Sequence, residues 1–235
     1  MSDAPERFEP DTFSGLPAEL GLARLPPGRH GLPRAFIASN QRLRIVAGML
    51  RVLPRHGYQA TTITHVTGEA GVSRAAFYQQ FTSKEDCFLA TYDVASEWFC
   101  GRVERVAASE EWPARVRVGV SEALALLAAN PTVAHLIGIE ALQAGRPGRE
   151  RQQACLERFA AALGPGDAGR PEVPPDLEQL LLGGVVSLIA RYVDSGRTEQ
   201  LPEATSVLVE SLLIPYLGPE KAERYAGLKR QARRS

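Results

Sequence analysis

The sequence predicts an all-α protein, in which a small N-terminal unit of three helices precedes a larger helical body. Apolar residues recur at helical spacing through most of the 235 residues, and no run alternates apolar with polar residues as a strand would. Glycine and proline separate the periodic segments, and a hydrophobic fraction of 44% suffices for a buried core. We expect a flexible arm at 1–38, a three-helix head at 39–84, a helical body at 85–218 and a basic tail at 219–235.

The first 35 residues are rich in proline and glycine, which is typical of an arm rather than a domain. Cations alternate with these residues toward the end of the arm. An extended basic segment of this kind can follow the phosphate backbone or enter the minor groove of DNA, and a disordered leader without a binding role is the alternative. The candidate arm contacts are Arg24, Arg29, His30 and Arg34.

The head is predicted to begin with one long helix. Ser39 or Asn40 should cap it, and an apolar face follows from Leu43 onward. Pro54 should kink the last turn or end it early, and Gly57 should then break the chain.

Residues 61–84 predict two further short helices joined by a tight turn. Thr62 and Ser73 are good N-caps, and Gly71 between the helices can adopt a positive φ at no steric cost. Phe77 and Phe81, four residues apart, form the inner face of the second helix. Its outer face suits the major groove of DNA better than bulk solvent, because it presents Arg74, Ala75, Tyr78 and Gln79.

Charge is unevenly distributed, although the net charge of the chain is zero. Arg and Lys outnumber Asp and Glu by ten to six in residues 1–84, but are outnumbered by nineteen to eleven in residues 85–217. Residues 218–235 are basic again, with six against two. A basic front on an acidic body is typical of a phosphate-binding head on a regulatory body, with chance clustering as the alternative.

Residues 57–88, GYQATTITHVTGEAGVSRAAFYQQFTSKEDCF, closely resemble the helix-turn-helix of the tetracycline-repressor (TetR) family of bacterial regulators. The chain departs from the usual family pattern at Ala75-Ala76 and at Gly68, inside the first short helix. A basic segment like residues 28–31 also occurs in long-armed members of actinobacterial type. The matching positions are Gly57-Tyr58, Thr61-Thr62, Ala70-Gly71-Val72-Ser73, Phe77-Tyr78, Phe81 and Lys84-Glu85.

The resemblance implies a homodimeric, ligand-responsive regulator, a repressor, whose two heads enter successive major grooves of a palindromic operator in double-stranded DNA. Arg74 and Gln79 would then read bases, and Ala75 would offer its methyl group to a thymine. Gln80 would lie at the periphery of the contact. Phosphates would be held by Thr62, Ser73, Tyr78 and Lys84. By the same resemblance, a small-molecule effector in the body would shift the fourth helix and spread the heads.

The body is predicted as a succession of helices, at Lys84 to about Val106, 113–129, 132–144, 150–163, 177–192 and 203–217. The last two are too apolar for a surface, and we expect a twofold-related copy to cover them rather than purely internal packing. His135 lies with Glu140 in an apolar stretch, where a polar group is more often a satisfied core residue than a ligand contact. Side chains available to line an effector pocket are Trp98, Trp112, His135, Phe159 and Tyr192.

No signature of an enzyme is visible, because nothing in the sequence arranges a nucleophile, a base, a metal or a cofactor. The three cysteines are too scattered for a disulfide framework, so buried reduced thiols are expected. Without a long apolar run or a signal core, we expect a cytoplasmic protein with no membrane partner, nucleoid-associated when bound to DNA. The alternative function is a helical ligand-binding or protein-interaction module without sequence-specific DNA binding, whose binding would lack a steep salt dependence.

Overall fold

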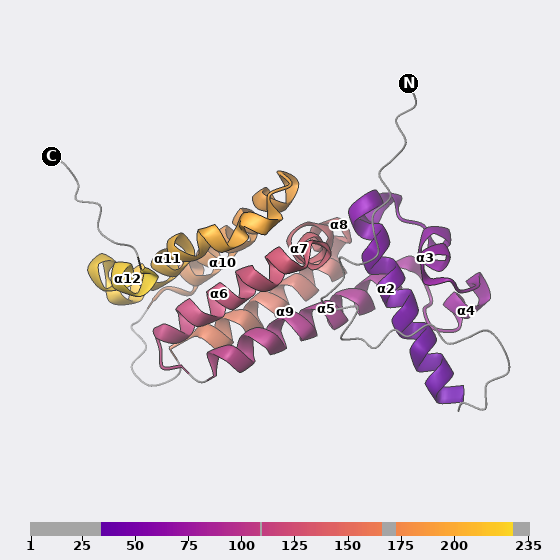
Figure 1. Cartoon of the computed structure of the whole chain (residues 1–235), viewed down its shortest axis with the longest axis horizontal. Coiled ribbons are helices and arrows are strands. Elements are labelled where there is room, and N and C mark those ends of the chain that lie inside the picture. The colour runs from indigo at the N-terminus through magenta and orange to yellow at the C-terminus, as the bar shows by residue number, and fades with distance from the viewer. Residues whose placement is uncertain (1–33, 109, 166–172, 228–235) are drawn as a thin grey trace, which may run out of the picture.

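The computed structural model describes residues 34–108, 110–165 and 173–227, and within these ranges the chain forms helices and no strand. The all-α prediction is therefore confirmed. Figure 1 shows a small head, made of α2, α3 and α4, at one end of an elongated helical body. Helix α12 lies at the opposite end of that body.

The head consists of α2 (Arg34–Ala60), α3 (Ile63–Ala70) and α4 (Arg74–Tyr78). Its core is formed where the apolar face of α2 meets the inner faces of the two short helices. Phe77 and Phe81 are both buried, as the four-residue spacing predicted. The buried partners that α2 and α3 contribute are Ile45, Val46, Met49, Leu50, Leu53 and Val66.

Helix α2 begins earlier than predicted, whereas the predicted break at Gly57 is confirmed. It begins at Arg34 rather than at Ser39 or Asn40, because Arg and Ala favour helices and no glycine or proline interrupts them. Residues 34–38, expected to belong to the arm, are thus helical. Pro54 does not end the helix. The dihedral break comes at Gly57, whose φ of 68° and ψ of 165° lie in a region that favours glycine.

Helix α5 (Lys84–Ala107) leaves the head and runs along the body, where it packs against α6 (Ala114–Ala129) and α9 (Gly145–Leu163). Figure 1 shows these three helices side by side. Because α5 also packs against α2, it is the helix that joins head and body. The remaining elements are α7 (Pro131–His135), the π-helical η2 (Leu136–Glu140), α8 (Ala141–Gln143), α10 (Pro175–Asp194), the 3-10 helix η3 (Thr198–Ala204), α11 (Thr205–Leu217) and α12 (Pro219–Ala226).

Two body helices begin where the sequence did not place them. Helix α9 starts at Gly145 rather than at Glu150, because Pro147 falls in its first turn, where no intrahelical donor is needed. Helix α12 occupies the start of the segment expected to be a basic tail. Ala222 and Ala226 are buried, and α12 packs against α11. The basic run of the tail itself, in residues 228–235, lies outside the described residues.

No single helix in the described parts of the chain is long and apolar enough to cross a membrane. Ala114–Ala129 and Pro131–Gln143 would meet the length and composition together, but only as a pair bent by 108°.

Candidate nucleic-acid interface

The two short helices of the head are held by capping hydrogen bonds. The Thr62 hydroxyl accepts the N–H of His65 at 3.2 Å, and the His65 Nδ1 atom accepts the N–H of Thr62 at 3.4 Å, which completes a capping box. Gly71 closes α3 with a φ of 62°, a left-handed conformation that favours glycine. The Ser73 hydroxyl then accepts the N–H of Ala76 and caps α4. These predictions of the local structure are confirmed.

Two arginines on α2 fix the position of the helix-turn-helix. Arg44 donates to the carbonyl oxygens of Ala70 and Gly71, at 2.7 and 2.9 Å. Both acceptors lie where α3 ends, so their free carbonyls are satisfied by a cation. Arg42 donates to the carbonyl of Gln80 at 2.8 Å, and its guanidinium lies 4.2 Å from the centre of the Phe81 ring. Hydrogen bonds from α2 therefore hold the turn on each side of α4.

A second set of contacts uses the acidic residue of the head. Arg51 and Arg55 both pair with the Glu69 carboxylate, at 2.8 and 3.3 Å. Among the Arg and Lys side chains that the structure describes between residues 40 and 84, Arg74 alone makes no hydrogen bond or ion pair within the chain. Much of the basic charge counted in the sequence thus serves the fold, and Arg74 remains available to a partner.

The outer face of α4 is open to solvent. Arg74, Ala75, Tyr78 and Gln79 are all exposed, and Tyr78 keeps 51% of its surface accessible while its ring packs edge-on against Phe77. The structure thus brings these four predicted site residues together on one short, braced helix. A guanidinium and an amide on such a helix have the hydrogen-bonding groups that read base edges in the major groove.

The other predicted contacts surround this face. The hydroxyls of Thr62 and Ser73 accept capping bonds but keep their own protons free for donation. Lys84 donates to the carbonyls of Tyr58 and Gln59, at 2.8 and 3.2 Å, so one of its three donors remains uncommitted. Gln80 is partly buried beside the face. These geometries allow phosphate contacts, and the individual roles stay predictions.

Most of the predicted minor-groove arm lies outside the described residues. Arg24, Arg29 and His30 lie outside the described residues, and Arg34 is the first residue of α2.

The head contacts the body through a buried carboxylate. Glu140, the last residue of the π-helical turn η2, is 3% exposed. Its Oε2 atom accepts the backbone N–H of Tyr58 at 2.6 Å, directly after the break at Gly57. Its Oε1 atom lies 3.3 Å from His135 Nδ1. His135 and Glu140 therefore lie side by side, although His135 Nδ1 makes no hydrogen bond within the described residues. π-Helical turns often occur at functional positions.

A narrow apolar cavity lies between α5, α6, η2, α9, α10 and α11. Its volume is about 40 Å³, which is enough for a molecule near the size of water and well below the roughly 150 Å³ of a cavity that admits benzene. Phe159 lines this cavity, whereas Trp98, Trp112, His135 and Tyr192 are not among its lining residues. Trp112 instead packs edge-on against Tyr216, and Tyr192 stacks against the Arg197 guanidinium.

Several lining residues were not predicted to line a pocket. Tyr92, Phe99 and Leu124 belong to the apolar faces of α5 and α6. Helical periodicity indicates which face of a helix is buried, but it does not distinguish a residue that faces a cavity from one that fills the core.

Comparison with known proteins identifies the head. The family model described as "Bacterial regulatory proteins, tetR family" matches residues 45–91. A curated relative, the uncharacterized HTH-type transcriptional regulator YerO of Bacillus subtilis (strain 168), is 38% identical over 58 residues. That match covers 25% of this chain and spans 19% of the length of the relative.

Solved structures of regulators share the fold over most of the chain. The transcriptional regulator FadR from Bacillus subtilis, in complex with stearoyl-CoA, superposes with a TM-score of 0.63 at 18% identity, covering 75% of this chain and 98% of its own. The fatty acid degradation regulator FadR from Bacillus halodurans has a TM-score of 0.63 at 17% identity, with coverages of 73% and 96%. The regulator PfmR from Thermus thermophilus has a TM-score of 0.56 at 20% identity, with coverages of 74% and 95%.

Proposed function

We propose that the chain is a DNA-binding transcriptional regulator of the TetR family, and that it acts as a homodimeric, effector-responsive repressor of a palindromic operator. The family model that matches residues 45–91 and the regulator that is 38% identical over 58 residues support this proposal. The head, residues 39–84, would contact DNA, and the body, residues 85–218, would dimerise and bind the effector. Such a protein acts in the cytoplasm, where the chromosome lies.

One observation carries the DNA-binding part of the proposal. The exposed face of α4 holds an Arg74 guanidinium that makes no hydrogen bond or ion pair within the described chain, while Arg42 and Arg44 bind the turns on either side of α4. A recognition helix needs fixed ends, and it needs exposed side chains that make no bonds within the protein. Both features favour a single docked geometry on DNA.

The test is the retention of fragmented genomic DNA by the purified protein at two salt concentrations, followed by sequencing. A few retained fragments that share an inverted repeat are expected. Their affinity should fall with salt by about 0.9 in log–log slope per phosphate contacted. Retention without sequence preference, or none even at low salt, would contradict operator binding.

Arg74 is expected to read a base. Arg74→Ala should cost about 1–3 kcal/mol on the operator and relax specificity at one position. Arg74→Lys is the matched variant, because lysine keeps the charge but lacks the planar fork that binds guanine in two places. It should therefore retain affinity for random DNA and lose affinity for the operator. Titration of both variants on operator and random duplexes checks this, and an equal loss on both DNAs for Arg74→Ala would exclude base reading.

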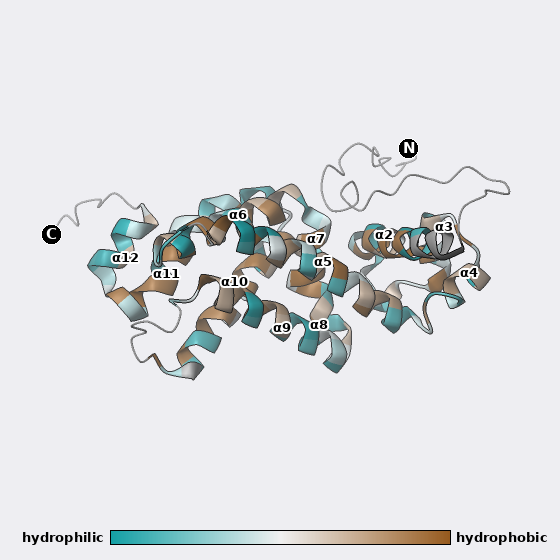
Figure 2. Cartoon of the chain, turned by 90° about the horizontal axis from the view of Figure 1, so that it is seen from below, coloured by the Kyte–Doolittle hydropathy of each residue, from teal (hydrophilic) through white to brown (hydrophobic). Residues whose placement is uncertain are grey.

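The dimerisation part of the proposal is supported by α10 and α11. Figure 2 shows that hydrophobic residues recur along both helices. Leu180 is 71% exposed on α10, and Val207 is 58% exposed on α11. A Cβ atom added at Gly183 or Gly184 would meet nothing within 4 Å, so this stretch of α10 is open to close approach by another helix. Exposed apolar side chains on two neighbouring helices favour a partner that covers them. A second copy of the chain is the simplest such partner.

Acidic substitutions on α10 and α11 are expected to dissociate the dimer. We expect Leu180→Glu, combined with Val207→Glu, to give monomers, because two carboxylates would be buried against an apolar surface in the dimer. Leu142→Glu is the control, since Leu142 is 49% exposed on α8, outside α10 and α11. Light scattering after size-exclusion chromatography measures the mass. A double variant that remains dimeric would place the interface elsewhere.

The effector is proposed to occupy the cavity beside α5. Nearly all of its lining is apolar, with the Tyr92 hydroxyl, Gln152 and Cys155 as exceptions. An apolar molecule with a small polar part matches that chemistry, and the Bacillus subtilis neighbour that holds stearoyl-CoA makes long-chain acyl compounds the first candidates. The surrounding helices would have to move apart to admit such a molecule, because the cavity volume is about 40 Å³. The effector must bind the state with spread heads better than the DNA-competent state, because otherwise the equilibrium between them does not move.

A further inference from the structure

A pair of thiols lies at the wall of this cavity. Cys100 on α5 and Cys155 on α9 are 2% and 7% exposed, and their sulfur atoms are 3.5 Å apart. Both are free cysteines. A disulfide requires an S–S distance of about 2.05 Å, so the sulfurs have only about 1.5 Å to travel.

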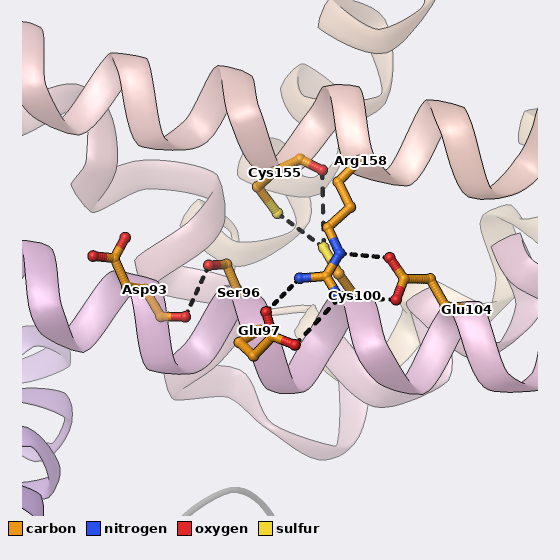
Figure 3. Close-up of polar contacts among 7 residues, drawn as sticks. All are labelled: Asp93, Ser96, Glu97, Cys100, Glu104, Cys155 and Arg158. Atoms are coloured by element: carbon orange, nitrogen blue, oxygen red, sulfur yellow. Dashed lines mark hydrogen bonds and ion pairs between the residues drawn. The ribbon is translucent and has the colours of Figure 1, made fainter.

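An ion-pair cluster on the outer side of the same helices sets the register that brings the sulfurs together. Figure 3 shows Arg158 of α9 reaching across to Glu97 and Glu104 of α5, with Cys100 between them along the helix. The Nη2 atom of Arg158 donates to Glu104 Oε2 at 2.8 Å. Hydrogen bonds from Arg158 lower the pKa of the Glu97 and Glu104 carboxyl groups, so both stay charged at neutral pH. Arg158 follows Cys155 by three residues, so the cluster and the thiols lie one helical turn apart.

The two thiols differ in their access to the cavity. Cys155 lines the cavity, together with Tyr92, whereas Cys100 is not among the lining residues. Either sulfur could be the donor of the contact between them, and this contact lowers the pKa of the Cys155 thiol. The thiolate is the nucleophilic form of cysteine, so Cys155 is the sulfur that meets and attacks an entering reactant.

We propose that Cys100 and Cys155 form a redox-active dithiol site, which hydrogen peroxide entering the narrow cavity oxidises to an intramolecular disulfide. This goes beyond DNA binding and does not depend on it. Hydrogen peroxide is small enough for the room that the cavity leaves beside Cys155.

The reaction proceeds in two steps. The Cys155 thiolate attacks one peroxide oxygen, the O–O bond breaks, and the departing hydroxide takes up the proton that the thiol lost, giving water and leaving Cys155 as a sulfenic acid. The Cys100 sulfur then attacks the sulfenic sulfur. The S–S bond forms, the S–O bond breaks, and the hydroxide leaves as water with the Cys100 proton. The two thiols lose two electrons in all, and hydrogen peroxide is reduced to two molecules of water.

The disulfide would tether α5 to α9. Because α5 begins at Lys84 in the head, the site lies on the helix that connects the cavity with the DNA-binding surface.

Cys87, the third cysteine, serves as an internal reference. Burial raises the pKa of the Cys87 thiol to about 12, and Cys87 does not line the cavity.

The experiment treats the full chain with cumene hydroperoxide or with hydrogen peroxide, counts free thiols and maps disulfides in non-reduced digests. We expect two of the three thiols to be lost, a disulfide that joins the peptides of Cys100 and Cys155, and full recovery with dithiothreitol. Hydrogen peroxide should act faster than cumene hydroperoxide, because the narrow cavity leaves no room for the cumyl group. A faster reaction with cumene hydroperoxide would contradict entry through this cavity.

Cysteine-to-alanine variants test the order of the two oxidation steps. Cys100→Ala should stop the reaction at a sulfenic acid on Cys155, which dimedone labels, whereas Cys87→Ala should form the disulfide as the wild type does. Mapping of the untreated and treated wild type needs no variant, so a failure of Cys100→Ala to fold would not obscure the result. The proposal is overturned if the wild type keeps all three thiols, or if the mapped disulfide contains Cys87.

Discussion

Gly48→Ala is expected to destabilise the head, although alanine is the better helix former. Gly48 lies in α2 against the backbone of α3. A Cβ atom there would stand 2.8 Å from the carbonyl oxygen of Val66 and 3.0 Å from the Cβ of Ala70. Relieving that contact requires α3 to move, at a cost of about 1–3 kcal/mol. This exceeds the gain of about 0.5–1 kcal/mol that alanine brings in a helix.

The same substitution at Gly68 supplies the control. Gly68 is exposed in the middle of α3, and a Cβ atom there would meet nothing within 4 Å. Gly68→Ala should therefore stabilise the protein by about 0.4–1 kcal/mol. Urea unfolding followed by far-ultraviolet circular dichroism compares the two variants. Shifts of the same sign would show that the distance between α2 and α3 is not limited at Gly48.

Glu140→Ala is expected to loosen the junction between head and body. It removes the acceptor of the buried Tyr58 N–H, and the carboxylate that lies beside His135. A buried donor left without an acceptor costs about 1–3 kcal/mol. Hydrogen exchange at the Tyr58 amide should accelerate by about tenfold for each 1.4 kcal/mol that is lost, if exchange occurs through local opening.

Glu140→Gln is the matched variant, because it keeps the side-chain length and one carbonyl acceptor for Tyr58. We expect its Tyr58 amide to exchange much more slowly than that of Glu140→Ala. Equal exchange in wild type and Glu140→Ala would mean that the contact at 2.6 Å does not hold the junction. If the proposed repressor function is correct, Glu140→Ala should also weaken the effect of an effector on DNA binding, since the carboxylate links η2 to the end of α2.

The helix-turn-helix was predictable because its signals are local. Thr62, Gly71 and Ser73 act on backbone groups within four residues, so capping and turn preferences identify them without knowledge of the rest of the fold. The outward direction of Arg74 and Tyr78 followed from the burial of Phe77 by the same helical geometry. Where local signals were weak, as at the start of α2, the prediction failed.

The sequence by itself determined the helical class, the caps and turn of the head and the chemistry on the outer face of α4, since these depend on residues one or two turns apart. The tertiary structure decided which arginines of the head form hydrogen bonds or ion pairs within the described chain, and that Arg74 forms none. It also brought Glu140 to Tyr58 and Cys100 to Cys155. These pairs are separated by 82 and 55 residues. The periodicity of a helix indicates which face is buried, but the partner of that face is set by how all the helices pack together.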